Sequence, residues 1–433
     1  MPYLSKYSRI LMNPYRLTLL ILLCTAGRLF AVDGQIKKAQ PGVVNSLKFK
    51  KDTVRSGKDT TKKVPEKDLY DVVRPIFNHH KTTEVVKKDT VTTKPTYSVV
   101  PVAGYSLVSR AVVTLTGNVA FRIDSSARES TITSYISYTE NKQFLLPLES
   151  EIWTKNNEFD LVGDSRFYKY PQSTFGLGSN SNMKNEEPMD YIYVRFYETA
   201  LKHIEGNLFL GAGYIIDYHG NITDQGPKNG APSAYQLYGP ETTDIATGYT
   251  LNGLYDSRDN SIYPEKGFYA SFQFRDNVTW LGSTSSWQSV TIDVRKYFQL
   301  PEGSDNILAF WNYDWLILNG KPGYLDLPSN QWDAYSSTGR GYIQGRFRGA
   351  REIYGETEYR FKVSANGLFG GVVFCNLQSY SGAPGTKLES IQPGFGPGLR
   401  IKLNKVSKTN IAIDYGFGRE GSNGLFVNIG EVF

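Results

Sequence analysis

The stretch Ile411-Ala-Ile-Asp-Tyr-Gly-Phe417 decides the fold, because large apolar side chains alternate in it with small or charged ones. In an extended chain the large residues share one face, and the other face carries Ala412, Asp414 and Gly416. Similar alternation recurs from about Ser98 to the end of the chain, and charged residues keep to one face of these segments. The pattern therefore predicts two-sided β-strands.

Such strands occur in water-soluble sandwiches and in membrane barrels, so alternation alone leaves both classes open. The mean hydropathy of -0.37 would suit a soluble protein. It also suits a barrel, because each strand hides one apolar face in lipid and turns the other toward a polar lumen. The chain holds 30 Tyr and 23 Phe, which is enough for the aromatic girdles of a membrane barrel.

The spacing of the turns predicts sixteen strands. The long connections fall at 169–189, 219–246 and 319–350, all after odd-numbered strands, whereas most connections after even-numbered strands are short, as at Leu300–Gly303. An even count with long loops on one side is typical of outer-membrane barrels. We therefore expect residues 97–433 to form a sixteen-stranded antiparallel transmembrane β-barrel of the outer membrane.

Residues 1–31 have the layout of a secretory signal peptide. Arg9 and Arg16 precede the apolar run Leu17–Cys24, and Ala31 offers a small residue for cleavage. As a membrane anchor, the same run would be shorter than the roughly 20 apolar residues of a spanning helix. We expect the chain to leave the cytoplasm.

We expect residues 32–96 to form a disordered basic tail in the periplasm, because the sequence keeps neither a helical nor a strand period there. Residues 33–95 carry 15 Lys and Arg against 8 Asp and Glu, whereas residues 96–433 carry 29 against 34. The net charge of +6 therefore belongs to the N-terminal part, and no basic patch in the main domain argues for nucleic acid. The lysine pairs of the tail suit either contact with an anionic partner or a solvated spacer.

The run Thr338-Gly-Arg-Gly-Tyr-Ile-Gln-Gly-Arg-Phe-Arg-Gly349 is the candidate functional loop. Its glycines allow the Arg340 guanidinium to approach a backbone closely. A charged group in a barrel lumen needs carboxylate or amide partners that offset its desolvation. Glu356 and Glu358 follow a few residues later and can supply them.

Four motifs in sequence order resemble the BamA/TamA family of outer-membrane proteins, also called bacterial surface antigens. They are the turn Tyr255–Gly267, the loop Gly339–Tyr342, the segment Glu356–Arg360 and a terminal strand closing on Phe433. The resemblance covers about residues 97–433. It implies a barrel whose first and last strands meet at a weakly paired seam, where strands of client proteins pair as they enter or cross the membrane.

The resemblance also assigns roles to residues. The lumen loop motif is Gly339, Arg340, Gly341 and Tyr342, the turn motif is Asp256, Arg258, Asp259, Pro264 and Gly267, and the seam with its C-terminal signal is marked by Tyr105, Leu425 and Phe433. Arg340 is expected to bond acidic side chains on the next two strands, and Glu358 matches the first partner. The turn motif also has a plain structural interpretation, because carboxylates flank a guanidinium in it.

The sequence departs from the family pattern in two places. Where the family has a second acidic partner, the chain reads Phe374-Cys-Asn-Leu-Gln378, and Asn376 brings no charge. Arg340 would then keep one carboxylate, unless Glu356 compensates. Residues 33–95 also have too little apolar periodicity for a polypeptide-transport-associated domain, so clients would arrive through the tail, a separate periplasmic subunit or the seam itself.

Catalysis finds little support in the sequence. It has no Gly-x-Ser-x-Gly elbow, and its four His are too scattered to predict a metal site. Cys375 is the one cysteine outside the signal peptide, and by parity it points to lipid. We expect no enzyme activity, no cofactor and no bound metal.

Three function classes stay open. The first is an insertase or translocase that acts at the seam on unfolded outer-membrane or secreted proteins. The second is a passive pore, whose selectivity would be set by the inward-facing cations Arg195, Arg275, Arg295, Arg360 and Lys362. The third is a structural or surface-antigen subunit, whose outer loops bind another protein.

Overall fold

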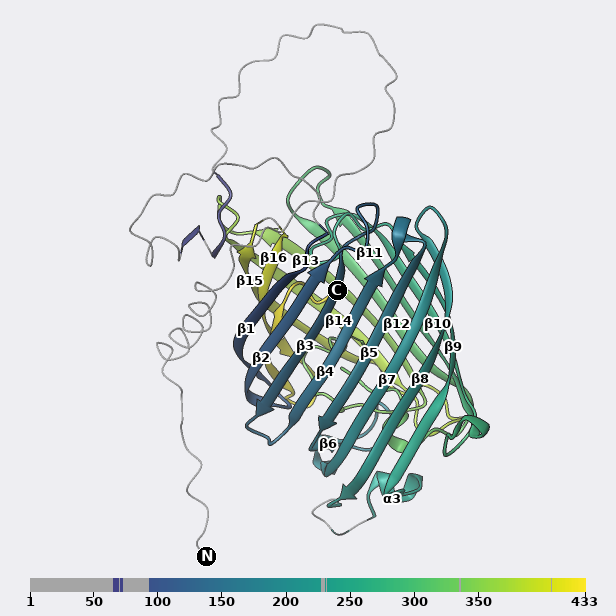
Figure 1. Cartoon of the computed structure of the whole chain (residues 1–433). Helices are drawn as coiled ribbons and strands as arrows, with labels where there is room; N and C mark the ends of the chain where they lie inside the picture. The colour runs from purple at the N-terminus through teal and green to yellow at the C-terminus, as the bar shows by residue number, and fades with distance from the viewer. Residues whose placement is uncertain are drawn as a thin grey trace, which may run out of the picture.

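The computed structural model describes residues 65–69, 71–72, 93–226, 230, 232–334, 336–405 and 407–433. Within this part of the chain the strands form one antiparallel sheet that curls into a barrel (Figure 1). The expected signal peptide lies outside the described residues. No helix in the described residues has both the length and the apolar character needed to cross a membrane.

The strands follow one another around the barrel in chain order. They are β1 Thr96–Ser106, β2 Arg110–Phe121, β3 Ser130–Thr139, β4 Phe144–Trp153, β5 Phe159–Lys169, β6 Gln172–Thr174, β7 Glu187–Glu205, β8 Leu208–Asp224, β9 Thr243–Asp256, β10 Gly267–Asn277, β11 Trp287–Gln299, β12 Ile307–Gly320, β13 Arg351–Lys362, β14 Phe369–Tyr380, β15 Gln392–Asn404, β16 Thr409–Phe417 and β17 Asn423–Ile429. The short β6 is an addition that pairs with β7. The remaining strands of the described chain make a wall of sixteen, so the predicted barrel is confirmed.

Among residues 93–433, the helical segments that the structure describes are short and lie in the connections. They are the α-helix α3 Ala234–Tyr238 and the 3-10 turns η2 Lys155–Asn157, η3 Met183–Asn185, η4 Thr279–Leu281 and η5 Tyr324–Asp326. Helix α3 starts with a capping box, in which Ser233 and Gln236 satisfy each other's backbone amides.

Alternation along the strands separates an outer face from an inner one. In β16, Ala412, Asp414 and Gly416 are buried, whereas Tyr415 and Phe417 are exposed. Outward side chains on other strands are also large and apolar, among them Leu251, Phe272, Val373 and Phe395. An apolar outer face suits hydrocarbon and a polar inner face suits a lumen, which is the arrangement of a membrane barrel.

The two ends of the barrel differ. The long connections 225–242 and 321–350 share one end with the β5–β7 connection, and the opposite end has short turns such as 206–207 and 405–408. We call the first the outer end and the second the inner end, following the usual orientation of outer-membrane barrels. Strands β7 and β8, with 19 and 17 residues, extend furthest at the outer end (Figure 1).

The barrel is nearly closed. Ladders join each wall strand to the next from β1–β2 to β16–β17, but no ladder between described residues joins β17 to β1. The two strands still lie side by side. A Cβ added to Gly424 on β17 would lie only 2.3 Å from the Leu107 side chain, just beyond β1. The first and last strands therefore lie next to each other without a described backbone ladder, and each keeps an unpaired edge at this junction.

The chain end turns inward. Strand β17 ends at Ile429, not at Phe433 as expected, and Gly430 follows with a φ of 100° that suits glycine. Phe433 is buried and stacks on Trp311 with ring centroids 5.2 Å apart. Arg360 Nη2 also donates to the Phe433 carbonyl at 2.8 Å. The C-terminus therefore packs in the lumen (Figure 1) and does not lengthen the seam.

Most of the expected disordered tail lies outside the described residues, but two pieces of it, 65–69 and 71–72, are described. They lie against the inner end of the barrel. Glu66 pairs with Lys402 at 2.5 Å, and Asp71 pairs with Lys405 at 2.6 Å. Asp68 also accepts the backbone amide of Lys405 at 3.0 Å. The tail is basic as a whole, but its contacts with the β15–β16 turn are made by its acidic residues.

Deletion of residues 33–95 should leave the barrel folded. The first wall strand starts at Thr96, and exposed ion pairs such as Glu66–Lys402 contribute at most about 1 kcal/mol each. The measurement is the mobility of unheated and heated protein on a denaturing gel, with the full chain as control. A deletion product that migrates as unfolded protein even without heating would contradict this prediction.

Candidate functional site

We call the connection 321–350 between β12 and β13 the lumen loop. Two of its glycines flank Arg340. Gly339 and Gly341 have φ angles of 74° and 108°, which side chains rarely adopt. A Cβ on Gly341 would also lie 2.8 Å from the carbonyl oxygen of Phe417, on the end of β16. Both positions therefore require glycine, and the loop backbone lies directly against the barrel wall.

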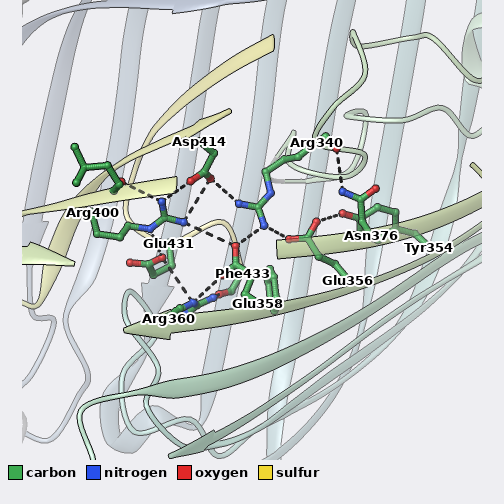
Figure 2. A network of polar contacts seen from close by, with 11 residues as sticks. Arg340, Tyr354, Glu356, Glu358, Arg360, Asn376, Arg400, Asp414, Glu431 and Phe433 are labelled. Atoms are coloured by element: carbon green, nitrogen blue, oxygen red, sulfur yellow. Dashed lines mark hydrogen bonds and ion pairs between the residues drawn. The ribbon is translucent and has the colours of Figure 1, made fainter. Parts of the chain in front are cut away.

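Arg340 is buried among three carboxylates (Figure 2). Its guanidinium bonds Glu356 and Glu358 on β13, and Nη1 donates to Asp414 on β16 at 2.5 Å. The same group lies over the ring of Phe374, 3.8 Å from the centroid. Charged partners on several sides offset the desolvation of the arginine and tie two separated strands to the loop.

Two of the three expected partners contact the Arg340 guanidinium, and the third contacts the loop backbone. Glu358 bonds Arg340, and Glu356 supplies a second carboxylate. Asn376 on β14 does not contact the guanidinium in the described contacts; its Nδ2 donates to the Arg340 backbone carbonyl at 2.9 Å. The third carboxylate, Asp414, was not assigned to the loop, although its position on the inner face of Ile411–Phe417 signalled that it points into the lumen.

Two more arginines extend the ion network. Arg360 on β13 donates to Glu358 at 2.7 Å. Arg400 on β15 donates to Asp414 at 2.5 Å and to Glu431, beyond β17, at 2.7 Å. Cations and anions therefore alternate from the lumen loop through β13, β15 and β16 to the C-terminal residues (Figure 2).

Tyrosine hydroxyls complete the polar surroundings. Tyr354 on β13 donates to Glu356 (Figure 2). Tyr342, the last residue of the loop motif, donates to the Pro393 carbonyl at 2.7 Å and accepts the amide of Arg419 at 2.9 Å. The loop is thereby attached to the β14–β15 side and to the β16–β17 connection by contacts that do not involve Arg340.

The turn motif forms a separate structure at the inner end. The Arg258 guanidinium donates two hydrogen bonds to the Asp256 carboxylate, at 2.9 and 2.7 Å. Asp259 instead accepts the backbone amides of Glu265 and Lys266 at 3.0 and 3.2 Å. Gly267 has a φ of 115°. Pro264 precedes these residues in the same turn. These contacts shape the β9–β10 connection, and the described bonds do not join it to Arg340.

The seam residues lie on the two free edges. Tyr105 on β1 is 42% exposed, and Leu425 on β17 is half-buried. Both lie toward the outer ends of their strands, because β1 and β17 run in opposite directions. Phe433 is separated from them, since it packs in the lumen beside Trp311.

The remaining inward cations are paired. Arg195 and Arg275 both bond Asp217, at 3.5 and 2.8 Å. The Arg295 guanidinium donates two hydrogen bonds to the Asp293 carboxylate, at 2.8 and 2.6 Å. Lys362 lies at the inner rim and pairs there with the exposed Asp305, a partner that no sequence motif predicted. Cys375 is exposed on the outer face, as its parity predicted.

Replacing Arg340 with alanine should destabilise the loop and the barrel. The change leaves Glu356, Glu358 and Asp414 without this cation in a buried site, and breaking a buried ion pair costs about 3–5 kcal/mol. We expect a lower temperature for loss of the folded band on a gel and faster proteolysis of the loop. Arg351→Ala on the exposed face of β13 is the matched control. Equal heat resistance of both variants and the parent would rule out an anchoring role for Arg340.

No protein-family model and no curated protein matches the chain. Among solved structures, BamA from Haemophilus ducreyi lacking POTRA domains 1-3 is similar with a TM-score of 0.51 and 10% identity, over 78% of this chain and 69% of that chain. CdiB from Acinetobacter baumannii is similar with a TM-score of 0.51 and 10% identity, over 78% of this chain and 60% of that one. A structural similarity at 10% sequence identity establishes the fold alone. The chain is an outer-membrane β-barrel with the fold of the BamA and CdiB barrels.

Proposed function

We propose that this barrel assists the insertion or export of other proteins through the seam between β1 and β17. The observation that carries the proposal is the missing ladder at this one junction of the described wall. An edge strand presents a row of unpaired N–H and C=O groups, which can template a strand from another chain. Addition of a strand to such an edge is a common way of binding an extended polypeptide.

The position of the ion network is consistent with a seam that can open between β1 and β17 while the neighbouring strands stay in place. Arg340 and Arg400 tie the lumen loop, β15 and β16 together, and Glu431 extends these ties to the residues after β17. Strand β17 itself is only seven residues long and ends at Ile429. Separation of β1 from β17 would leave the ion network intact, because the described network takes no residue from β1.

The filled lumen argues for a lateral path. Most of 324–350 is buried inside the wall, and Leu327 belongs to an apolar cluster with Tyr193 and Trp287. The arginines that would have set the selectivity of a passive pore are bonded to carboxylates. Client strands would therefore use the seam, with delivery by a periplasmic subunit or by direct capture.

Photo-crosslinking in living cells tests the seam. Probes placed at Tyr105 and at Leu425 should form adducts with many newly made outer-membrane proteins. A probe at Leu251, which is 53% exposed on the outer face of β9, is the control and should form few. No adducts from the seam probes, or adducts with a single abundant partner, would contradict client passage and favour a structural subunit.

Conductance in planar bilayers tests the alternative of a passive pore. We expect low conductance from the parent barrel, because the lumen loop and the paired arginines fill its interior. Replacement of residues 321–350 by a short turn also removes the Arg340 anchor, so the comparison uses only the fraction of this variant that keeps a folded band on an unheated gel. That fraction should conduct several-fold more than the parent. If the parent already conducts as well as this deletion variant, the loop does not close the lumen, and the result favours a passive pore.

A further inference from the structure

Three side chains of metal-ligating type meet on the outer half of the barrel. They are His219 near the end of β8, Asp244 at the start of β9 and Asp326 in η5 of the lumen loop. One ligand atom from each lies within 4.8 Å of the others. The residues are only 3%, 5% and 6% exposed, so the cluster is shielded from bulk water. Segments far apart in the sequence therefore build one buried site.

Each of the three residues has a buried polar atom without a hydrogen-bond partner. These atoms are His219 Nδ1, Asp244 Oδ2 and Asp326 Oδ2. Burial of unsatisfied polar groups is costly, and two neighbouring carboxylates add mutual repulsion. The nearest carboxylate oxygen to His219 Nδ1 is Asp326 Oδ1 at 3.5 Å, which is too long for a good hydrogen bond. A cation would satisfy all three groups at once.

The ligands are held in place by their neighbours. The His219 ring stacks on Tyr193 with centroids 4.8 Å apart and meets the edge of Tyr191 at 5.7 Å. Arg348 fixes the backbone that carries Asp326, since its Nη1 donates to the carbonyls of Tyr324, Leu325 and Leu327 at 3.2, 3.1 and 3.3 Å. Such outer contacts orient ligands before an ion arrives.

The loop backbone approaches Asp244 where only glycine fits. A Cβ on Gly323 would lie 1.8 Å from Asp244 Oδ2. A cavity of about 250 Å³, lined by Asp244, Glu241, Lys321 and Gly323 among others, adjoins the cluster. Because Asp244 lines this cavity, an ion in it would contact one of the three ligands directly.

Nearby arginines already have other partners. Arg275 and Arg195 bond Asp217, and Arg348 is engaged with three backbone carbonyls. The charges of Asp244 and Asp326 are therefore not the main partners of these guanidinium groups. A dication would supply the compensation that the described contacts of the two carboxylates do not.

We propose that His219, Asp244 and Asp326 bind a divalent transition-metal ion, for which Zn²⁺ is the natural probe. One imidazole nitrogen and two carboxylate oxygens, with water in the fourth position, suit Zn²⁺ coordination. Mg²⁺ and Ca²⁺ prefer sites made of oxygen ligands, so the histidine disfavours them. The ion fastens the η5 turn of the lumen loop to β8 and β9, whereas Arg340 attaches the loop to β13 and β16. This role does not depend on the proposed function.

The test uses the full barrel in detergent, purified without a polyhistidine tag, stripped with a chelator and re-equilibrated with Zn²⁺. Elemental analysis after dialysis should find one ion per chain, and Co²⁺ in place of Zn²⁺ should give visible absorption bands. His219→Gln and Asp326→Asn should weaken binding by at least the roughly 10- to 100-fold that loss of an outer contact already causes. Zn²⁺ should also raise the unfolding temperature of the parent barrel and not that of His219→Gln.

Matched controls use the other histidines. His203→Gln alters an exposed turn at the inner end, and His79→Gln with His80→Gln removes the pair of the N-terminal tail. Both should keep one ion per chain. A parent barrel that retains no Zn²⁺ overturns the proposal whether or not the variants fold. Full binding by His219→Gln, or loss of binding in the His79 and His80 variant, overturns it as well.

Discussion

The burial of Arg340 against Glu356, Glu358 and Asp414 is the interaction on which the rest of the structure depends. The wall arginines Arg360 and Arg400 pair with Glu358 and Asp414, and Arg340 from the loop is the cation that contacts all three carboxylates. Entry of the loop into the lumen therefore joins β13 and β16 through one buried guanidinium. In return, the loop keeps its buried arginine only while β13 and β16 hold their register.

This constraint divides the barrel into a fixed part and a free part. The ion network runs from β13 to the residues after β17, so the last strands are tied to the lumen loop from inside. Strand β1 takes no part in the described network, and its edge meets β17 without a ladder. A strong internal anchor beside a weak junction is a physical basis for lateral opening, which needs one edge to move while the other stays.

The lumen loop supports the proposal of a lateral path over that of a passive pore. Its buried residues and the paired arginines occupy the space that ions would need. The loop is attached at Arg340 to carboxylates of β13 and β16, and the cluster of His219, Asp244 and Asp326 brings its η5 turn against β8 and β9. Attachment at two separated places would hold the loop more rigidly than either place could alone.

The sequence by itself determined the strands and the loop motif, because both are local properties. Alternation in Ile411–Phe417 follows from the period of two in any extended chain, and Gly339 and Gly341 mark a backbone that other residues cannot adopt. The partner Glu358 could be assigned because it lies near Arg340 in the chain and matches a family motif.

Only the tertiary structure decided which distant residues meet. Asp414 reaches Arg340 because closure of the barrel brings β16 beside the loop, and His219 reaches Asp326 because the loop returns across the lumen to β8. The inward turn of Phe433 depends on Trp311 and Arg360, which lie more than seventy residues earlier in the chain. Pairings of this kind depend on barrel closure and on the path of the loop, and no local pattern in the sequence carries that information.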